Sequence, residues 1–561
     1  MKKIYSLLML ALLAASCTLD RDPETTLTDK DFWTSETFLR GACNRLYIDL
    51  PGFSHDKRSD ELVGPNQDAI SSGNRSVPGT SDDWTKPYDK IGVCNNIIIK
   101  AEAGPLPQTV KNRWIAEARF FRAYHYFDLV KKYGDVPLIL KVFDNTTDPD
   151  IRRARDPRET VIRQCYADLD FALEHLPAIE NLRSEANWGR VSQSAALGMM
   201  VRIGLYEGTH KKYHHTPEGD YKEHLKKAID AAETMIYTEK KHDLYPDFQK
   251  LFYFDGEGSS NKESVFVKIY GPNGAGTITH NNSRGLENTA AVTRSMLDNF
   301  LYSDGLPREK SPLRISPEVR YADILANRDP RLAMTVYSVG EKAYKNNAYQ
   351  PFKTDDQTHG YGYPIKKGFI NSEWSTNSKE TLDKIIIRYA EILISYAEAL
   401  YEYNGSISDT KLDETINYVR RRAGFDVKLT NAFVQGHGLD MLQEIRRERM
   451  VEFIDENLHY DDIIRWKTAE TVLPKAVLGL LYNSEDSPAI KENTLSARFT
   501  DANGNYKGEK LYDQAKIYVI EESGSRSFDP QRDYLYPIPS YEIGTSGGNI
   551  KQNPYWGNET N

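Results

Sequence analysis

The chain has 561 residues, of which 39% are hydrophobic and 27% charged, and its formal net charge at pH 7 is −9. This composition is typical of a folded protein, and it argues against both a disordered chain and a polytopic membrane protein. An acidic chain without a long lysine or arginine cluster also argues against nucleic-acid binding. Tyrosine is abundant, with 35 residues against 20 phenylalanines. Because a tyrosine ring has an apolar face and a polar tip, it suits both a wet binding surface and a half-buried core.

Residues 1–16 have the pattern of a secretory signal peptide. Lys2 and Lys3 precede an apolar stretch that is too short to span ~30 Å of hydrocarbon as a helix. Small residues come directly before Cys17, which is the arrangement of a bacterial lipobox. We therefore expect cleavage before Cys17 and lipidation of this residue, with an ordinary cleavable signal as the alternative. Several acyl chains on one cysteine would anchor the protein stably to a membrane.

The chain after Cys17 is predicted to be mainly α-helical, with paired helices that suggest stacked hairpins of the tetratricopeptide (TPR) kind. The clearest pattern lies in residues 388–402, where apolar residues recur at the spacing of one helical face and Asn404-Gly405 ends the helix. The predicted helices are residues 36–50, 86–102, 110–132, 158–176, 191–208, 222–237, 388–402, 411–422, 439–456 and 459–468, and the predicted strands are residues 264–270 and 516–520.

Long polar loops separate these helices. The predicted loops are residues 51–85, 141–157, 255–290, 338–380 and 483–532, and Asn503-Gly504 predicts a tight turn in the last of them. The loops contain Trp, Tyr, Asn and Asp rather than low-complexity runs, so we expect them to be ordered and functional. Cys43, Cys94 and Cys165 are an odd number, which excludes a complete disulfide framework. We expect three buried thiols, although Cys43 and Cys94 could pair.

Few patterns point to catalysis or to a metal. Residues 544–548 match G-x-S-x-G, but no histidine follows them, so a serine hydrolase is not predicted. His210, His214 and His215 lie beside lysines, and we expect an exposed loop rather than a metal site. Residues 501–512 begin like a calcium loop but lack its glycine and its final glutamate. The sequence therefore predicts no catalytic residue, no metal and no cofactor.

A set of segments along the whole chain has a distinctive sequence. They are AEARFFRAYHYFDLVKKYGDVPLI (116–139), YSDGLP (302–307), NRDPRL (327–332), RYAEILISYAEAL (388–400), INYVRRRAG (416–424), IRRERMVEFIDENLHYDDIIRW (445–466) and YLYPIPSYEI (534–543). In this order they resemble the SusD/RagB family of outer-membrane lipoproteins. The resemblance implies a TPR-like scaffold with long irregular loops and minor β-hairpins, and it implies binding without cleavage.

The resemblance also implies a function and a location. It implies that a glycan is captured at the cell surface and passed to a SusC-like TonB-dependent transporter. The acidic residues after Cys17 resemble the export signal of surface lipoproteins in Bacteroidetes-type bacteria, so we expect a lipid-anchored protein exposed on the outer membrane. Two alternatives stay open, which are capture of peptides, as in some members of the family, and a glycan-active enzyme or purely structural scaffold. We divide the chain into a signal peptide (1–16), a TPR-like part (17–240) and a C-terminal part (241–561) that together form one compact unit.

Most of the family motifs are expected to form the scaffold rather than the ligand site. The segment 445–466 holds a dense group of arginines and glutamates beside apolar residues. This group could grip an anion, but a partly buried ion network that holds helices together explains it better.

The ligand residues are therefore expected in the loops. A sugar presents apolar C–H faces and a rim of hydroxyls, so its site needs an exposed aromatic ring and hydrogen-bonding side chains. Trp374 has no apolar neighbours in the sequence and is the strongest candidate platform, whereas Trp84 is equally well explained by packing against the helix that follows it. The predicted ligand-binding residues are Trp374, Trp84, Asp60, Asn66, Asp68, Arg75, Tyr270, His280, Asn281 and Tyr361.

Overall fold

The structure is a computed structural model of the whole chain. It describes residues 32–143, 145–184, 187–273, 276–353, 362–495, 499–500, 502–503, 510–512 and 515–557. The lipidation site predicted at Cys17, the ligand residue predicted at Tyr361 and the glycine of the turn predicted at 503–504 lie outside the described residues. No helix in the described ranges is long and apolar enough to cross a membrane.

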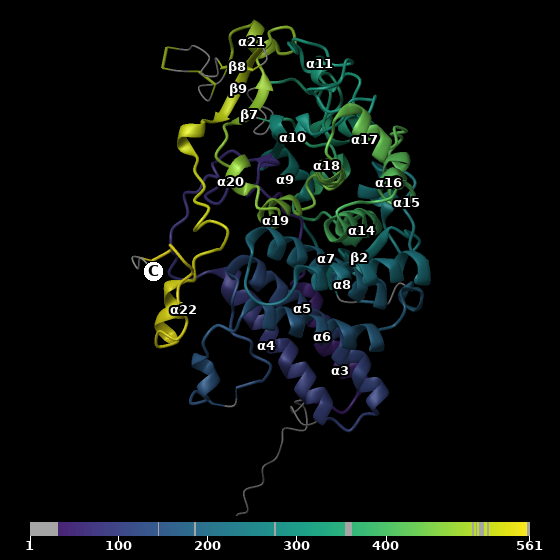
Figure 1. Cartoon of the computed structure of the whole chain (residues 1–561), viewed down its shortest axis with the longest axis vertical. Helices are drawn as coiled ribbons and strands as arrows, with labels where there is room; N and C mark the ends of the chain where they lie inside the picture. The colour runs from purple at the N-terminus through teal and green to yellow at the C-terminus, as the bar shows by residue number, and fades with distance from the viewer. Residues whose placement is uncertain are drawn as a thin grey trace, which may run out of the picture.

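The fold is mainly α-helical, as predicted (Figure 1). Long helices from the first half of the chain form the lower part of the molecule in this view, and most helices from the second half lie above them, whereas α22 near the C-terminus lies at the level of α4. Consecutive helices pack against each other, and α14 packs against α7, α8 and α18. The main helices are α3 (Glu36–Ile48), α4 (Asp82–Ala103), α5 (Gln108–Tyr133), α6 (Arg158–His175), α7 (Gln193–His214), α8 (Tyr221–Glu233), α14 (Tyr389–Asn404), α18 (Met441–Glu452) and α19 (His459–Arg465).

Shorter helices occupy the loops of the second half. They are α9 (Asn282–Asn288), α10 (Arg294–Asp298), α11 (Tyr321–Leu325), α12 (Pro330–Thr335), α13 (Asn371–Thr376), α15 (Asp409–Glu414), α16 (Ile416–Arg422), α17 (Asn431–His437), α20 (Ala469–Val472), α21 (Pro488–Lys491) and α22 (Ser540–Thr545). Single turns of other helix types are η1 (Pro149–Arg152), η2 (Ile179–Leu182), the π-type η3 (Thr234–Glu239), η4 (Lys250–Phe252), η5 (Phe254–Gly256), η6 (Tyr344–Asn346) and η7 (Ser523–Ser525). The predicted loops are thus built from short ordered pieces.

Local sequence explains where the long helices begin and end. Ser81 and Ser192 accept hydrogen bonds from the first turns of α4 and α7, which satisfies backbone groups that a helix start leaves unpaired. Gly134 and Gly405 follow α5 and α14 with φ angles of 73° and 74°. A residue with a side chain would be strained at these angles, so glycine at both positions ends the helix at low cost.

The described strands form small antiparallel sheets. The strands are β1 (Leu62–Val63), β2 (Ser264–Lys268), β3 (Gly271–Asn273), β4 (Gly276–Ile278), β5 (Ala291–Val292), β6 (Lys384–Arg388), β7 (Val477–Leu481), β8 (Lys510–Tyr512) and β9 (Ala515–Glu521). They pair as β1 with β5, β2 with β6, β3 with β4, and β7–β9–β8. In the β2–β6 pair Ser264 lies opposite Arg388 and Lys268 lies opposite Lys384. Both strands predicted from the sequence are confirmed.

Two apolar cores support the fold. The larger one lies between the long helices and includes Phe120, Phe121 and Leu393. The smaller one lies under the loops and sheets of the second half and includes Phe300 and Phe352. Cys43, Cys94 and Cys165 are buried free thiols, as expected.

A buried ion network connects the helices of the second half, which confirms the structural interpretation of segment 445–466. Arg449 pairs with Asp462 at 2.8 Å, and Arg465 pairs with Glu398 at 2.6 Å. Further buried ion pairs join Arg331, Arg388, Arg420 and Arg422 to Glu263, Glu448, Glu452 and Glu456. Breaking one such pair strands a buried charge, so the network fixes the relative positions of β2, β6, α14, α16, α18 and α19.

Similar pairs join the two halves of the chain. Arg202 on α7 pairs with Glu391 on α14 at 2.6 Å, and Lys212 on α7 pairs with Glu402 at 2.7 Å. These contacts cross the boundary predicted at residue 240, and the division of the chain at that position stays a prediction.

Two local expectations are wrong. The helix predicted over 411–422 is two helices, because Thr415 has a non-helical backbone between α15 and α16. The histidines near residue 210 are not on an exposed loop, because α7 continues to His214 and buries His210. The rings of His210 and His214 stack one turn apart with their centroids 4.1 Å from each other.

Candidate ligand-binding site

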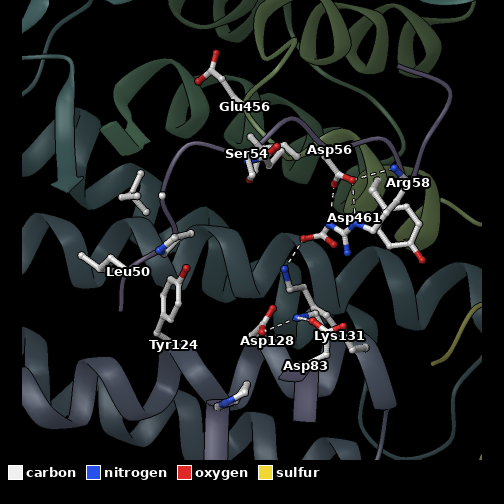
Figure 2. Close-up of a pocket in the computed structure, with 18 of the residues that line it drawn as sticks. Leu50, Ser54, Asp56, Arg58, Asp83, Tyr124, Asp128, Lys131, Glu456 and Asp461 are labelled. Atoms are coloured by element: carbon white, nitrogen blue, oxygen red, sulfur yellow. Dashed lines mark hydrogen bonds and ion pairs between the residues drawn. The ribbon is translucent and has the colours of Figure 1, made fainter. Parts of the chain in front are cut away.

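A cleft of about 880 Å³ separates the N-terminal helices from the segments above them. Figure 2 shows α5 on one side, with Tyr124, Asp128 and Lys131 on it, and the chain from Leu50 to Arg58 passing over the opposite side. Its walls come from α4, α5, α7, β6, α19 and the segments 49–58 and 534–536. Segments far apart in the sequence therefore meet around one hollow.

Charged side chains line this cleft, and most of them are already paired. Lys131 on α5 meets Asp461 on α19 across the cleft (Figure 2). The ammonium group of Lys132 lies 2.8 Å from a carboxylate oxygen of Asp83 and 2.9 Å from one of Asp128. Further pairs are Arg58 with Asp56, Lys86 with Asp82, Lys90 with Asp49 and Arg202 with Glu391. The cleft thus presents many hydrogen-bonding groups with little unbalanced charge.

Burial shifts the protonation of several lining residues. Burial lowers the pKa of Lys384 on β6 to about 8 and that of His125 on α5 to about 4, so His125 is neutral at pH 7. Burial would raise the pKa of Asp128, but the charges of Lys132 and Lys131 hold it below its usual value. The ammonium of Lys384 donates a hydrogen bond of 2.6 Å to the carbonyl of Gly52.

Most of the aromatic rings that line the cleft are buried in its wall. Tyr460 and Tyr536 are 5% and 8% exposed. The guanidinium of Arg58 lies over the Tyr460 ring at 4.3 Å and donates to the hydroxyl of Tyr536 at 2.9 Å. Tyr124 is partly exposed in the wall. These rings offer hydroxyl groups and a limited stacking surface to a ligand.

The predicted residues of the N-terminal loop lie near this cleft, but several have structural partners. Asp68 lines the cleft, and its carboxylate accepts from the backbone N–H groups of residues 70 and 71 at 2.8 and 2.9 Å. Asn66 is exposed. Arg75 donates to the carbonyl of Asp533 at 2.5 Å, and Asp60 accepts from His459 at 2.8 Å. Arg75 and Asp60 therefore tie the loop to the C-terminal half.

Trp84 is part of the core. It is 3% exposed, and its ring packs edge-to-face on Tyr133 with centroids 4.9 Å apart. A ligand therefore cannot stack on it, and the packing explanation weighed in the sequence analysis holds.

The structure brings two other predicted loops together. The backbone of His280 pairs with that of Glu380, and Asn281 accepts a hydrogen bond of 3.2 Å from the Ser378 N–H. Tyr270 is 7% exposed and packs edge-to-face on the His280 ring at 4.6 Å. Of the three predicted residues Tyr270, His280 and Asn281, only Asn281 is exposed.

Trp374 lies on α13 beside these loops and is half-buried against the smaller core. Its indole N–H donates to Glu287 at 2.5 Å, and the guanidinium of Arg284 lies over its ring at 4.4 Å. Lys345 lies 5.5 Å from the ring centroid. The ring is therefore less open than the polar sequence around it predicts, because cations from neighbouring loops contact it.

The cleft residues on the helices are not among the ligand-binding residues predicted from the sequence. Tyr124, Asp128 and Lys131 lie within a family motif that we assigned to the scaffold. Their spacing of four and then three residues places them on one face of the predicted helix 110–132. A polar stripe on an otherwise apolar helix is the signal that could have found them.

Ser546 of the G-x-S-x-G segment has a structural role. It is 3% exposed, donates to the carbonyl of Ile543 at 2.8 Å and accepts from the N–H of Ile550 at 3.1 Å. These bonds fix the chain after α22.

Comparison with solved structures defines the class of the fold. A SusD-like carbohydrate-binding protein from Bacteroides fragilis is similar over 92% of this chain and 99% of its own, with a TM-score of 0.72 and 24% identity. Surface glycan-binding protein A from Bacteroides fluxus is similar over 93% of this chain and 100% of its own, with a TM-score of 0.60 and 20% identity. The architecture is therefore that of SusD-like proteins.

Sequence comparison agrees with the fold. The model of the SusD family matches residues 250–556, and a second model, described as starch-binding associating with outer membrane, matches residues 67–205. A SusD-like protein from Bacteroides ovatus is 26% identical over 83% of this chain and 82% of its own. SusD-like protein P2 from Formosa agariphila is 24% identical over 98% of this chain and 99% of its own. The chain belongs to the SusD family, which confirms the resemblance found in its motifs.

Proposed function

We propose that this protein binds a neutral oligosaccharide at the outer surface of the outer membrane and passes it to a SusC-like TonB-dependent transporter. A lipid at Cys17 anchors it there. Family membership supports this function, as does the likeness in fold to proteins named for carbohydrate and glycan binding. The oligosaccharide lies in the cleft described above.

The observation that carries the choice of a neutral ligand is the pairing of the cleft's charges. A neutral hydroxyl-rich ligand can hydrogen-bond to the remaining positions of Asp128, Lys131 and Asp461 while their ion pairs stay intact. An ionic ligand would have to take the place of one partner of a pair and leave the displaced side chain, which has the ligand's own sign of charge, without its counter-charge, which costs free energy. Neutral sugars therefore suit the cleft better than ionic ligands do.

The size of the cleft favours an oligosaccharide over a monosaccharide. Its volume of about 880 Å³ lies in the upper part of the ~300–1,000 Å³ range of ligand pockets. Each net hydrogen bond contributes ~0.5–1.5 kcal/mol, and association itself is costly, so we expect affinities between roughly millimolar and micromolar. A ligand held this weakly can leave for the transporter.

Calorimetry with a length series of neutral oligosaccharides tests this function. Asp128→Asn keeps the size of the side chain but removes its charge, and should weaken binding ~10-fold, equivalent to ~1.4 kcal/mol. Asp230→Asn is the matched control, because Asp230 pairs with a lysine one turn away on the exposed face of α8. Monosaccharide binding as tight as that of the longest chain, or equal affinities of Asp128→Asn and wild type, would contradict the cleft as the site.

Trp374 marks a second candidate surface for the same function. Its ring is partly exposed, and Ser372, Asn377 and Ser378, which lie near it in the sequence, are exposed. Trp374→Ala should weaken binding ~10-fold if sugars stack there, and should leave it unchanged if the cleft is the only site.

The two alternative functions, peptide capture and glycan cleavage, predict different experimental results. Peptide capture predicts tighter binding of peptides than of any neutral oligosaccharide in the same calorimetric series. A glycan-active enzyme would shorten the oligosaccharide during a long incubation, whereas we expect the chain length to stay constant.

A further inference from the structure

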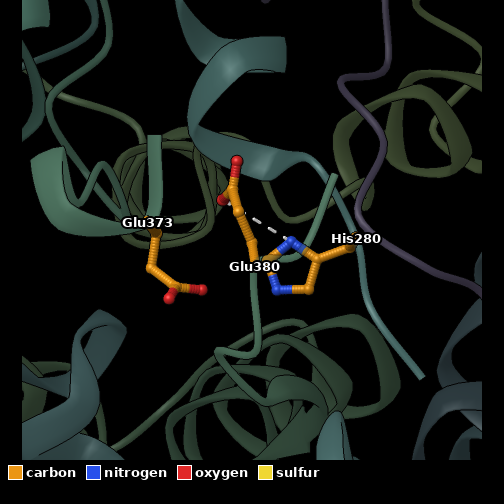
Figure 3. Close-up of side chains that lie close together, drawn as sticks. All are labelled: His280, Glu373 and Glu380. Carbon is orange, nitrogen blue, oxygen red and sulfur yellow. Dashed lines mark ion pairs between the residues drawn. The ribbon is translucent and has the colours of Figure 1, made fainter. Parts of the chain in front are cut away.

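A second cluster of polar side chains lies away from the cleft, beneath the loop that holds Asn281. His280, Glu373 and Glu380 point toward one another from three segments (Figure 3), and one ligand-type atom from each lies within 4.8 Å of the others. Glu373 belongs to α13, whereas His280 and Glu380 face each other in an isolated antiparallel bridge. The three side chains are distant in sequence, and the fold brings them together.

The two carboxylates of this cluster are buried. Glu380 is 1% exposed and Glu373 is 7% exposed. Among the described residues no lysine or arginine forms an ion pair with either of them, in contrast to the glutamates of the ion network. Two buried carboxylates this close together repel each other and are both poorly solvated. Their ionised forms therefore need a positive charge between them.

The orientation of the His280 ring also favours a cation within this cluster. Its Nε2–H donates to the carbonyl of Leu382 at 2.9 Å, so Nδ1 is the unprotonated nitrogen; it accepts from the Asn282 N–H at 3.1 Å and lies 3.7 Å from a carboxylate oxygen of Glu380. The ring therefore presents an unprotonated nitrogen, which is the form of histidine that binds a metal, close to a buried carboxylate. In known metal sites the histidine ligand usually donates its other N–H to a carbonyl or a carboxylate in this way.

We propose that His280, Glu373 and Glu380 bind a divalent metal ion of the zinc or manganese type. Zinc bonds of ~2.0–2.2 Å to nitrogen and oxygen place tetrahedral donor atoms about 3.4 Å apart, close to the 3.7 Å between His280 and Glu380. One imidazole with two carboxylates suits Zn²⁺ or Mn²⁺ better than Ca²⁺, which prefers six to eight oxygens. The ion replaces the contact from the Asn282 N–H to His280 Nδ1, which is 3.1 Å long.

The surroundings already hold the carboxylates in place. The Ser283 N–H donates to both oxygens of Glu380, at 3.0 and 2.8 Å, and the Thr381 N–H donates to Glu373. Such support orients ligands for a metal. A bound ion would join α13, and with it Trp374, to the loop around residue 280 and to residue 380.

Metal titration of the full-length protein in detergent, stripped with EDTA, tests the site. Calorimetry with ZnCl₂ and MnCl₂ should show one ion per chain and a raised melting temperature, with CaCl₂ binding more weakly. His280→Gln, Glu373→Gln and Glu380→Gln should each weaken binding at least ~10-fold, the range that even outer-shell partners of metal sites show. Glu257→Gln is the control, because Glu257 lies near Glu373 but outside the cluster.

X-ray absorption of the zinc-loaded wild type keeps the proposal testable if the variants do not fold. It should show one imidazole among nitrogen and oxygen ligands. The proposal is overturned if neither zinc nor manganese binds stoichiometrically, if the spectrum contains no imidazole, or if all three variants bind as tightly as the wild type.

Discussion

The pair formed by His459 and Asp60 should make the stability of the protein depend on pH above neutrality. His459 on α19 is 6% exposed, and its Nε2 lies 2.8 Å from a carboxylate oxygen of Asp60. Burial alone would lower the pKa of His459, but the hydrogen bond and the charge of Asp60, with smaller effects from Glu61 and Asp462, raise it to about 9. The folded protein therefore holds this proton more tightly than the unfolded chain, where histidine titrates near ~6.5.

The size and direction of the effect follow from this difference. Below ~6.5 both states are protonated, so the contribution is fully present. As the pH rises the unfolded chain loses its proton first, and the stabilisation declines until the folded pKa near 9 is passed. The difference of roughly 2.5 between the folded and unfolded pKa values of His459 corresponds to ~3 kcal/mol of unfolding free energy, which is lost between pH 6 and 9.5.

Urea unfolding of wild type and His459→Gln across this pH range measures the effect. The contribution of Glu61 to stability must be distinguished from that of His459. Burial raises the pKa of Glu61 to about 8, so the stabilisation that Glu61 provides also declines as the pH rises. The difference between wild type and His459→Gln should therefore shrink from pH 6 to 9.5, whereas His437→Gln, at an exposed site on α17, should follow the wild type throughout. A difference that stays constant over the range would refute the reasoning.

Three further changes test the fold and the anchor. Trp84→Ala should lower the unfolding free energy by ~3–5 kcal/mol in urea, because it empties a buried site, and Trp374→Ala should lower it by less, because that ring is half exposed. Glu398→Gln should lower it by ~3–5 kcal/mol, since the buried Arg465 keeps only Asp462 of its two charged partners, and a loss below 1 kcal/mol would contradict this role. Cys17→Ala should abolish acyl labelling and move the protein out of the membrane fraction, and an unchanged fractionation would contradict the anchor.

The sequence predicted the scaffold better than the site, for a physical reason. A helix such as α14 has a periodic apolar face, and that period is visible in residues 388–402 without any knowledge of tertiary contacts. The exposure of Trp374 was not predictable in this way, because the cation over its ring comes from residue 284, some 90 positions earlier. The surroundings of a loop residue depend on which other loops fold next to it.

The cleft could not be predicted from the sequence for the same reason. Its lining residues on α4, α5 and α19 are polar positions inside helices, and each one alone looks like an ordinary solvated face. Only the packing of α5 near α19 turns Lys131 and Asp461 into opposite walls of one hollow. That packing is a long-range contact, which the pattern of either helix does not encode.

The ion pairs that link α7 to α14 bear on how this chain can be divided. One family model begins at residue 250 and the other ends at residue 205, so each recognises a separate stretch of sequence. Yet Glu391 and Glu402, on the later stretch, are neutralised by Arg202 and Lys212, which the later family model does not include. A fragment cut at the edge of that model would contain the buried Glu391 without Arg202, and Glu402 with only Arg446 of its two basic partners. We therefore expect the stretches matched by the two family models to fold together rather than as separate units.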